Sequence, residues 1–224
     1  SVAMQSRFLQ AFGVALLVLA CASRPAAAGD PLESSVWIEV ARAGEVKFNG
    51  YKLPRVGEGM GVVTPAREIV TAAHVVWGAS VITVIDRNGT KITARVERID
   101  QNVDVALLHV EQRLEHFAPL RAEPVVRGER VGAVEQRRSK GPPGMMTGMV
   151  GTAHWTSHGV AVPLIFSGIK GEKGMSGGGL FDEAGELVGI VIRIDAKLGY
   201  LSALPVAELC TRFERCPAPP QPSR

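Results

Sequence analysis

Short runs of apolar and β-branched residues, separated by turn residues, run through most of the chain. Runs of this length are typical of strands, and many short strands between turn signals predict an all-β protein of barrels or sandwiches instead of an alternating α/β sheet. The expected strands lie at 36–40, 60–63, 68–71, 81–85, 90–99, 104–110, 128–134, 149–155, 160–166 and 187–194. Short helices are expected at 72–77 and 206–213.

Two hairpins are expected in the first half of the chain. Asn88-Gly89 separates the runs 81–85 and 90–99, and Asn-Gly between β-branched runs is a strong signal for a tight hairpin turn. The other hairpin precedes His74, so its second strand would carry this histidine at its end.

The first 28 residues have the pattern of an export signal. A short polar start with Arg7 is followed by an apolar run from Ala11 to Ala22 and by Ala26-Ala27-Ala28 as a small-residue cleavage site. We therefore expect residues 1–28 to be removed on export to the bacterial periplasm or the medium. The run is short for a membrane span. A buried N-terminal helix or an uncleaved anchor is the alternative. Val18-Leu19-Ala20-Cys21 also resembles a lipobox, so a lipoprotein held at the membrane through Cys21 is a further alternative.

The charge of the chain is close to balanced. Its formal net charge is +3, and cleavage after Ala28 would remove Arg7 and Arg24, leaving 23 basic against 22 acidic residues, a net charge of +1. Such a balance gives no indication of nucleic-acid binding.

Cysteines provide a second indication of compartment. Cleavage would also remove Cys21 and leave Cys210 and Cys216. An even pair in an exported chain predicts a disulfide, with two reduced cysteines as the alternative. This bond would cross-link two nearby positions in the C-terminal segment.

Three polar residues have the types that nucleophilic catalysis requires. Ser176 lies within Gly174-Met175-Ser176-Gly177-Gly178, His74 ends Thr71-Ala72-Ala73-His74, and Asp104 opens Asp104-Val105-Ala106-Leu107-Leu108. A serine hydroxyl needs an imidazole to take its proton and a buried carboxylate to hold that imidazole in the right tautomer. Asp104 is preferred over Asp100 and Asp86 because only Asp104 opens an apolar run that would bury its carboxylate.

Chain order separates the known serine-hydrolase arrangements. The glycine-rich segment matches the G-x-S-x-G elbow of α/β-hydrolases, in which the histidine follows the serine. All the histidines precede Ser176, which excludes that arrangement: His74, His109, His116, His154 and His158. The subtilisin order needs an aspartate before the histidine, and Asp30, at the edge of the expected export signal, is the only one before His74. The order that remains is His, Asp, Ser, as in chymotrypsin-like proteases.

The blocks TAAHVV, DVALLHV and GMSGGGLFDEAGELVGIVI resemble the signature blocks of trypsin-like serine proteases. The aspartate block and the 30-residue separation of His74 and Asp104 are similar to those of the bacterial HtrA/Deg type. The resemblance runs from about Val36 to Ala207. It implies a protease domain at 29–213 with two six-stranded antiparallel β-barrels, at about 33–120 and 121–208, the triad in the cleft between them, and a short C-terminal helix.

The resemblance implies an exported serine endopeptidase, a hydrolase acting on protein or peptide substrates without a metal or an organic cofactor. The backbone N–H groups of Gly174 and Ser176 would form its oxyanion hole. The strand Ile192-Arg193-Ile194 would pair with the substrate backbone. Arg193 in the specificity pocket would favour an acidic residue before the scissile bond, whereas Ile192 and Ile194 there would favour small apolar residues.

The chain departs from this family pattern in two places. Met175 stands where trypsin has an aspartate and HtrA proteases usually have an asparagine, and methionine cannot make the hydrogen bonds of that asparagine. The alternative function is therefore a catalytically impaired protease-fold protein that binds partners in the cell envelope. HtrA-type proteases usually carry PDZ modules, for which the expected mature chain is too short; residues 214–224 read as a proline-rich tail.

Overall fold

The computed structural model describes residues 29–135 and 143–214. The expected export signal at 1–28, with Cys21, lies outside the described residues, as does the segment from Arg215 onward, with Cys216. Among the described residues, no helix is long and apolar enough to cross a bilayer.

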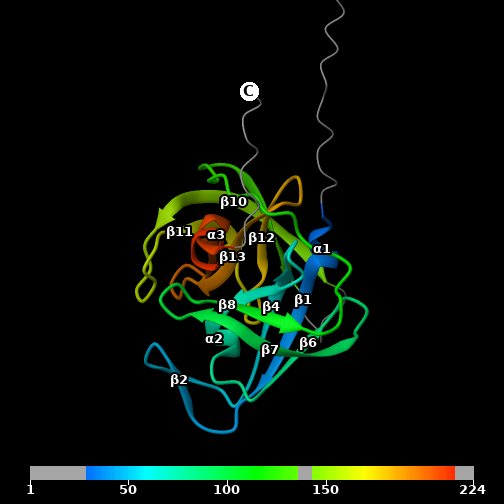
Figure 1. Cartoon of the computed structure of the whole chain (residues 1–224). Helices are drawn as coiled ribbons and strands as arrows, with labels where there is room; N and C mark the ends of the chain where they lie inside the picture. The colour runs from blue at the N-terminus through cyan, green and yellow to red at the C-terminus, as the bar shows by residue number, and fades with distance from the viewer. Residues whose placement is uncertain (1–28, 136–142, 215–224) are drawn as a thin grey trace, which may run out of the picture.

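The described residues fold into two closed antiparallel barrels of six strands each, the chymotrypsin-like arrangement (Figure 1). Around the first barrel the strands follow the order β1 (Ser35–Ala41), β4 (Val56–Val63), β5 (Ile69–Ala72), β8 (Val105–Val110), β7 (Lys91–Asp100) and β6 (Val81–Ile85). Around the second barrel the order is β10 (Gly144–Trp155), β11 (Leu164–Lys170), β14 (Tyr200–Pro205), β13 (Leu187–Ile194), β12 (Gly179–Asp182) and β9 (Arg130–Glu135). The predicted fold class is confirmed.

Shorter elements complete the fold. A separate two-stranded hairpin of β2 (Val46–Phe48) and β3 (Tyr51–Leu53) follows β1. The part of the chain that the structure describes also contains three short helices: α1 (Pro31–Ser34), α2 (Ala73–Val76) and α3 (Val206–Phe213). In Figure 1, α3 lies beside the strands of the second barrel, and β2 lies at the opposite end of the molecule.

A shared hydrophobic cluster holds the barrels together. Ile38, Met60 and Leu108 of the first barrel belong to the same buried cluster as Phe181 and Ile190 of the second. All five side chains are fully buried. Because such contacts exclude water over the whole interface, they fix the relative position of the two halves on which any site between them depends.

The strand pattern predicted most element positions and failed at identifiable places. The expected strands at 81–85 and 187–194 and the helix at 206–213 have the observed bounds of β6, β13 and α3. The expected strand at 160–166 was wrong at its start, since β11 begins at Leu164. Val160 instead closes a turn by donating its N–H to Ser157 O (3.2 Å), and Pro163 lacks the N–H that a strand would use.

Candidate active site

Helix α2 carries His74 at the end of β5, and a buried arginine holds this short helix in place. Arg42 is 6% exposed. Its guanidinium donates hydrogen bonds to four carbonyl oxygens, those of His74 (3.2 Å), Val75 (2.7 Å), Trp77 (2.8 Å) and Pro54 (2.9 Å). Burial lowers the pKa of Arg42 below its ordinary value. A four-residue helix has no internal partners for its last carbonyls, so Arg42 supplies them and fixes the backbone of His74.

Asp104 is hydrogen-bonded to His74 through both of its carboxylate oxygens. Oδ2 lies 2.8 Å from His74 Nδ1, and Oδ1 accepts the His74 backbone N–H at 2.9 Å. Asp104 is 2% exposed, whereas the His74 side chain is 27% exposed. The carboxylate places the proton of the neutral ring on Nδ1, so Nε2 is left with a free lone pair that can accept a proton.

The backbone of Asp104 is itself unusual. Its φ is +60°, in the left-handed region that non-glycine residues seldom adopt. The Asp104 carbonyl accepts the N–H of Ala73 (3.1 Å), which joins the start of α2 to the residue before β8. Strained backbone of this kind persists only where surrounding contacts hold it, and here the contacts are those with α2.

The other acidic residues that competed for this role are engaged elsewhere. Asp100 pairs with Arg212 (2.8 Å) and accepts the Asn102 N–H (2.9 Å). Asp86 accepts the Thr90 N–H within the β6–β7 hairpin (2.8 Å). The structure therefore brings only Asp104, among these three aspartates, to His74.

The loop around Ser176, residues 171–178 and called here the serine loop, is hydrogen-bonded to both barrels. Ser176 O accepts the N–H of Met60 in β4 (2.8 Å), and Gly177 N–H donates to Val191 O in β13 (2.6 Å). A Cβ placed on Gly59 would meet both Ser176 O (2.8 Å) and a methyl group of Val75 (2.7 Å), the residue after His74. Ser176 and His74 therefore lie on adjoining segments at the junction of the barrels.

The hydroxyl of Ser176 is not hydrogen-bonded to the His74 ring in the described part of the chain. Such bonds are often long before a substrate binds and tighten in the complex.

The backbone amides of the serine loop fall into two groups. Met175 N–H donates to Glu172 O (3.2 Å), Gly177 N–H to Val191 O (2.6 Å), and Gly178 N–H to Met175 O (3.1 Å). The N–H groups of Gly174 and Ser176 donate no hydrogen bond within the described residues. The amides of Gly174 and Ser176, which the sequence predicted as an oxyanion hole, thus have no acceptor among the described residues, and the same holds for the amide of Lys173.

Met175 holds its loop by packing and by a weak hydrogen bond. Its side chain is 2% exposed and belongs to the core cluster of the second barrel. Its thioether sulfur accepts the N–H of Glu172 at 3.4 Å. In place of the hydrogen bonds of an amide side chain, Met175 thus contributes a buried apolar side chain and one sulfur acceptor. These contacts hold the loop around Ser176 in place.

The three side chains of the predicted substrate strand, residues 192–194, lie in different surroundings. Ile192 is 1% exposed and lies in the core between the barrels. Ile194 is half-buried, and a Cβ on Gly171 would lie 2.8 Å from its side chain and 2.5 Å from that of Leu201. Arg193 points elsewhere, because its Nη2 lies 3.5 Å from a Cβ built on Gly159.

The predicted disulfide falls partly outside the described chain. Cys210 lies in α3, but Cys216 is not among the described residues. The pairing therefore stays a prediction.

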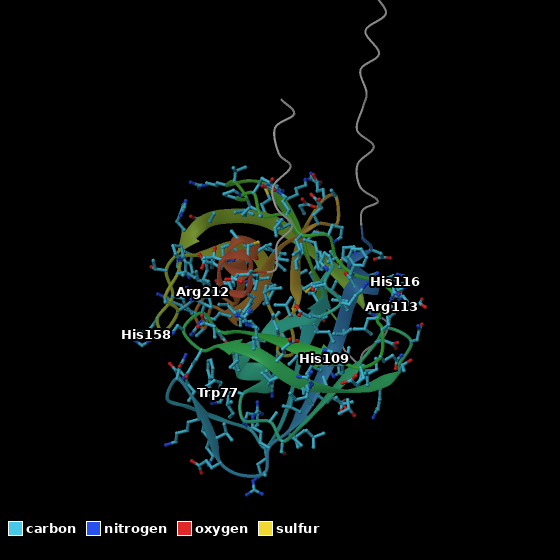
Figure 2. The ribbon with its side chains drawn as sticks, viewed as in Figure 1. Trp77, His109, Arg113, His116, His158 and Arg212 are labelled. Atoms are coloured by element: carbon cyan, nitrogen blue, oxygen red, sulfur yellow. The ribbon has the colours of Figure 1, made fainter. Side chains whose placement is uncertain are left out.

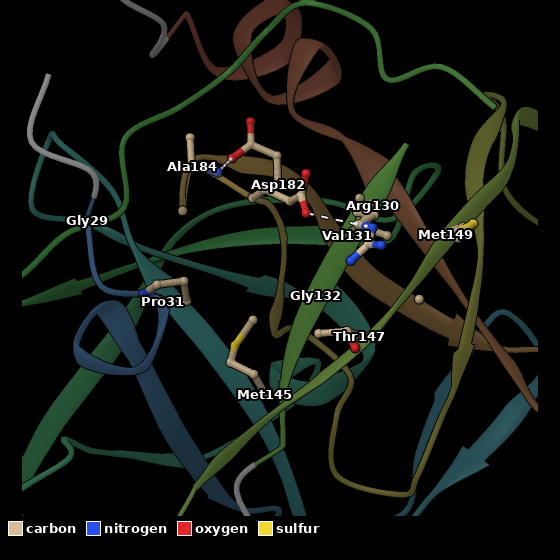
Figure 3. Close-up of a pocket in the computed structure, with 13 residues that line it drawn as sticks. Gly29, Pro31, Arg130, Val131, Gly132, Met145, Thr147, Met149, Asp182 and Ala184 are labelled. Carbon is tan, nitrogen blue, oxygen red and sulfur yellow. Dashed lines mark hydrogen bonds and ion pairs between the residues drawn. The ribbon is translucent and has the colours of Figure 1, made fainter. Parts of the chain in front are cut away.

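A cavity of about 680 Å³ lies on another part of the surface, against β9, β10 and the turn at 182–185 (Figure 3). Its walls include Met145, Met149 and Asp182 and none of the candidate catalytic residues. The candidate chemistry therefore belongs to the junction of the barrels and not to this cavity.

Sequence reasoning missed Arg42. Its acceptors are backbone carbonyls, and those on α2 lie more than 30 residues further along the chain. The one available signal was an isolated cation directly after a strand that ends in Ala41, without an acidic residue beside it. That signal is too common on protein surfaces to single out a buried residue.

Comparison with known proteins places the chain in a family. The model of the trypsin-like peptidase domain matches residues 59–190, a segment that contains His74, Asp104 and Ser176. The chain belongs to the trypsin-like peptidase family. No curated protein matches its sequence.

Solved structures show the same fold as this trypsin-like peptidase domain. The HtrA-type protease AlgW with a tripeptide matches with a TM-score of 0.70 at 21% identity, covering 82% of this chain and 60% of AlgW. Its S227A form with a tripeptide gives a TM-score of 0.71 at the same identity and coverage. The Rv3671c protease in an inactive form matches with a TM-score of 0.68 at 24% identity, covering 87% of this chain and all of that one. The chain thus spans less than two thirds of the AlgW chains that it matches.

Proposed function

We propose that this trypsin-like peptidase domain is a serine endopeptidase in which Ser176 is the nucleophile, His74 the general base and Asp104 the orienting acid. The observation that carries the proposal is the pair of hydrogen bonds between Asp104 and His74. Beside it, the N–H groups of Gly174 and Ser176 donate no hydrogen bond within the described residues. A purely structural Asp–His pair would not require unused N–H groups next to a serine. Membership of a peptidase family supports the same conclusion.

The reaction follows from this arrangement. His74 Nε2 takes the proton of Ser176 Oγ as the oxygen attacks the scissile carbonyl, and the N–H groups of Gly174 and Ser176 stabilise the oxyanion that forms. The imidazolium then gives its proton to the leaving amine, and the C–N bond breaks to leave an acyl-enzyme. Water, deprotonated by His74, hydrolyses the ester and restores the serine. Each proton is moved by His74, so the cycle calls for no metal and no organic cofactor.

Small apolar residues before the scissile bond are the substrates that the site favours. Ile194 and Leu201 both lie against Gly171, on the strand end that leads into the serine loop. Branched side chains at this position would make a pocket there shallow, which favours alanine or valine over a long side chain. Arg193 reaches the Gly159 side instead, which argues against an acidic residue in this pocket. Peptides that end in Val or Ala should be cleaved well, and those that end in Glu poorly.

Hydrolysis of such peptides by the full chain tests the function. We expect turnover by the wild type, with losses of more than about a thousandfold in Ser176→Ala and His74→Ala. A control variant, His109→Ala, should retain full activity, because His109 lies on the surface of β8 beside Glu111. A folded wild-type chain that cleaves none of these peptides would support the alternative of a protease-fold binding protein.

We also propose that the protein acts after export, because residues 1–28 carry the pattern of an export signal. Fractionation of cells expressing the full chain should recover it from the periplasm or the medium, shortened by about 28 residues. Retention in membranes that is lost in Cys21→Ser would instead identify a lipoprotein.

A further inference from the structure

A polar cavity of about 480 Å³ lies next to the candidate catalytic pair. Residues that line it include Asn49, Tyr51, Gln101, Asn102, His158 and Arg193. Asn102 is two residues before Asp104, and the ring of Phe48, next to Asn49, lies 6.2 Å from the ring of His74. The cavity is therefore within reach of a peptide whose scissile bond is at Ser176.

Arg193 brings an uncompensated positive charge to this cavity. Its Nε is buried and has no hydrogen-bond partner. Its guanidinium also makes no ion pair or other hydrogen bond within residues 29–135 and 143–214. Arg193 as a whole is half-buried, so the remaining N–H groups of its guanidinium can still donate to a ligand that enters the cavity.

The surrounding side chains do not neutralise Arg193. Gln101 donates its amide to Asn49 Oδ1 (2.7 Å), and both are uncharged. The Asn102 carbonyl accepts the N–H of Ala161 (2.9 Å), which ties the cavity wall to the loop before β11.

Carboxylates close to this wall are already engaged. Asp100 pairs with Arg212, and Asp104 holds His74. Besides Arg193, the ionisable side chains of the lining are Tyr51 and His158, and His158 lies at the left edge of the molecule in Figure 2. The cavity therefore presents basic, amide and hydroxyl groups and no carboxylate.

The pleat of β13 relates the cavity to a bound peptide. Ile194 faces Gly171, and Arg193, the preceding residue, faces the opposite side of the strand. A peptide paired with this strand has the same alternation, so the residue before the scissile bond points to Gly171 and the second and fourth residues point to the cavity.

We propose that Arg193 and the polar cavity form a subsite for a carboxylate side chain at the second or fourth peptide residue before the scissile bond. This inference rests on the proposed function and assigns it a substrate class: peptides with a small apolar residue at the cleaved bond and a Glu or Asp one or three residues earlier. A bidentate contact with a carboxylate would give acceptors to the Nη donors of Arg193, which have no partner among the described residues.

Fluorogenic peptide pairs that differ only in Glu or Gln test this proposal. Each pair has Val before the cleaved bond and the variable residue at the second or the fourth position. We expect the Glu peptide of one pair to have a kcat/KM about tenfold to a hundredfold above its Gln partner. Arg193→Met should reduce this ratio to about one, while Arg193→Lys should retain part of the preference.

Arg113→Met is the matched control, because Arg113 is exposed and lies on the opposite edge of the molecule from His158 (Figure 2). It removes the same charge and should leave the ratio intact. Equal rates on Glu and Gln peptides in the wild type, or an unchanged ratio in Arg193→Met, would overturn the subsite and leave the proposed function standing.

Binding to Ser176→Ala separates the subsite from catalysis. Fluorescence anisotropy with labelled, uncleaved peptides should show tighter binding of the Glu peptide, and Arg193→Met introduced into this variant should abolish the difference. Equal binding of the two peptides would contradict the subsite even if the wild type proved inactive. Thermal unfolding should show Arg193→Met to be folded, because the substitution removes an unpartnered donor and no hydrogen bond.

Discussion

Replacement of Gly177 by alanine should separate the serine loop from the first barrel. A Cβ on Gly177 would lie 2.1 Å from Met60 O, 2.2 Å from Thr71 Oγ1 and 2.9 Å from Ala72 N. Such contacts require a shift of about 1 Å to reach ordinary van der Waals separation. The φ of Gly177 is +86°, which alanine tolerates poorly.

The cost can be worked from these contacts. The left-handed conformation costs alanine about 1–2 kcal/mol. A shift of the loop also weakens the bonds from Met60 N–H to Ser176 O (2.8 Å) and from Thr71 Oγ1 to Met60 O (2.6 Å), at about 1 kcal/mol each. We therefore expect Gly177→Ala to lower the free energy of unfolding by about 3–4 kcal/mol. Peptidase activity should fall at least about a hundredfold, because a misplacement near 1 Å has that effect.

Gly89→Ala isolates the backbone effect from the steric clash. Gly89 has a similar φ of +83°, and a Cβ there would meet nothing within 4 Å. Urea denaturation followed by fluorescence should show a loss of only about 1–2 kcal/mol for Gly89→Ala. Equal losses in the two variants would refute the close contact between the serine loop and β4.

Other substitutions test the remaining contacts. Arg42→Met should lower the free energy of unfolding by about 3 kcal/mol in urea denaturation and reduce peptidase activity, because four carbonyls lose their donor; a loss under about 0.5 kcal/mol would contradict the role of Arg42. Asp104→Asn should keep the fold, since asparagine tolerates a φ of +60°, and should reduce kcat about ten-thousandfold; near-normal kcat would remove Asp104 from the mechanism. The hydrogen bond from Arg121 lowers the pKa of Glu129 below its ordinary value of 4.5, so this pair stabilises the fold above about pH 4.5 and the stabilisation is lost as pH falls through the lowered pKa. The difference in unfolding free energy between wild type and Arg121→Met should accordingly shrink between pH 7 and pH 3, and a constant difference would exclude this linkage.

Much of the fold could be predicted from the sequence because turn residues and β-branched runs agree with the observed strands. Asn88-Gly89 between β-branched runs predicts the β6–β7 hairpin, and the structure pairs Ile85 with Lys91 around that turn. The β2–β3 hairpin was not foreseen, because Val46–Phe48 and Tyr51–Leu53 are three residues each and one of every three is a lysine. Strands this short carry too little alternation to be recognised.

The sequence predicts the parts of the candidate site that depend on residue type and chain order. His74, Asp104 and Ser176 follow from the order of three blocks, and the structure joins the first two directly. The tie between Ser176 O and Met60 N–H, and the position of Arg193 in a polar cavity, depend on backbone geometry between segments far apart in the sequence. No local pattern encodes such distances.

Covalent labelling of Ser176 tests the central claim most directly. The wild-type chain, incubated with a fluorophosphonate and measured by intact mass spectrometry, should gain one adduct that peptide mapping assigns to Ser176. Ser176→Ala should gain none, and Asp104→Asn should be labelled far more slowly. A folded wild-type chain without an adduct, or with the adduct on another residue, would contradict the assignment of Ser176 as the nucleophile.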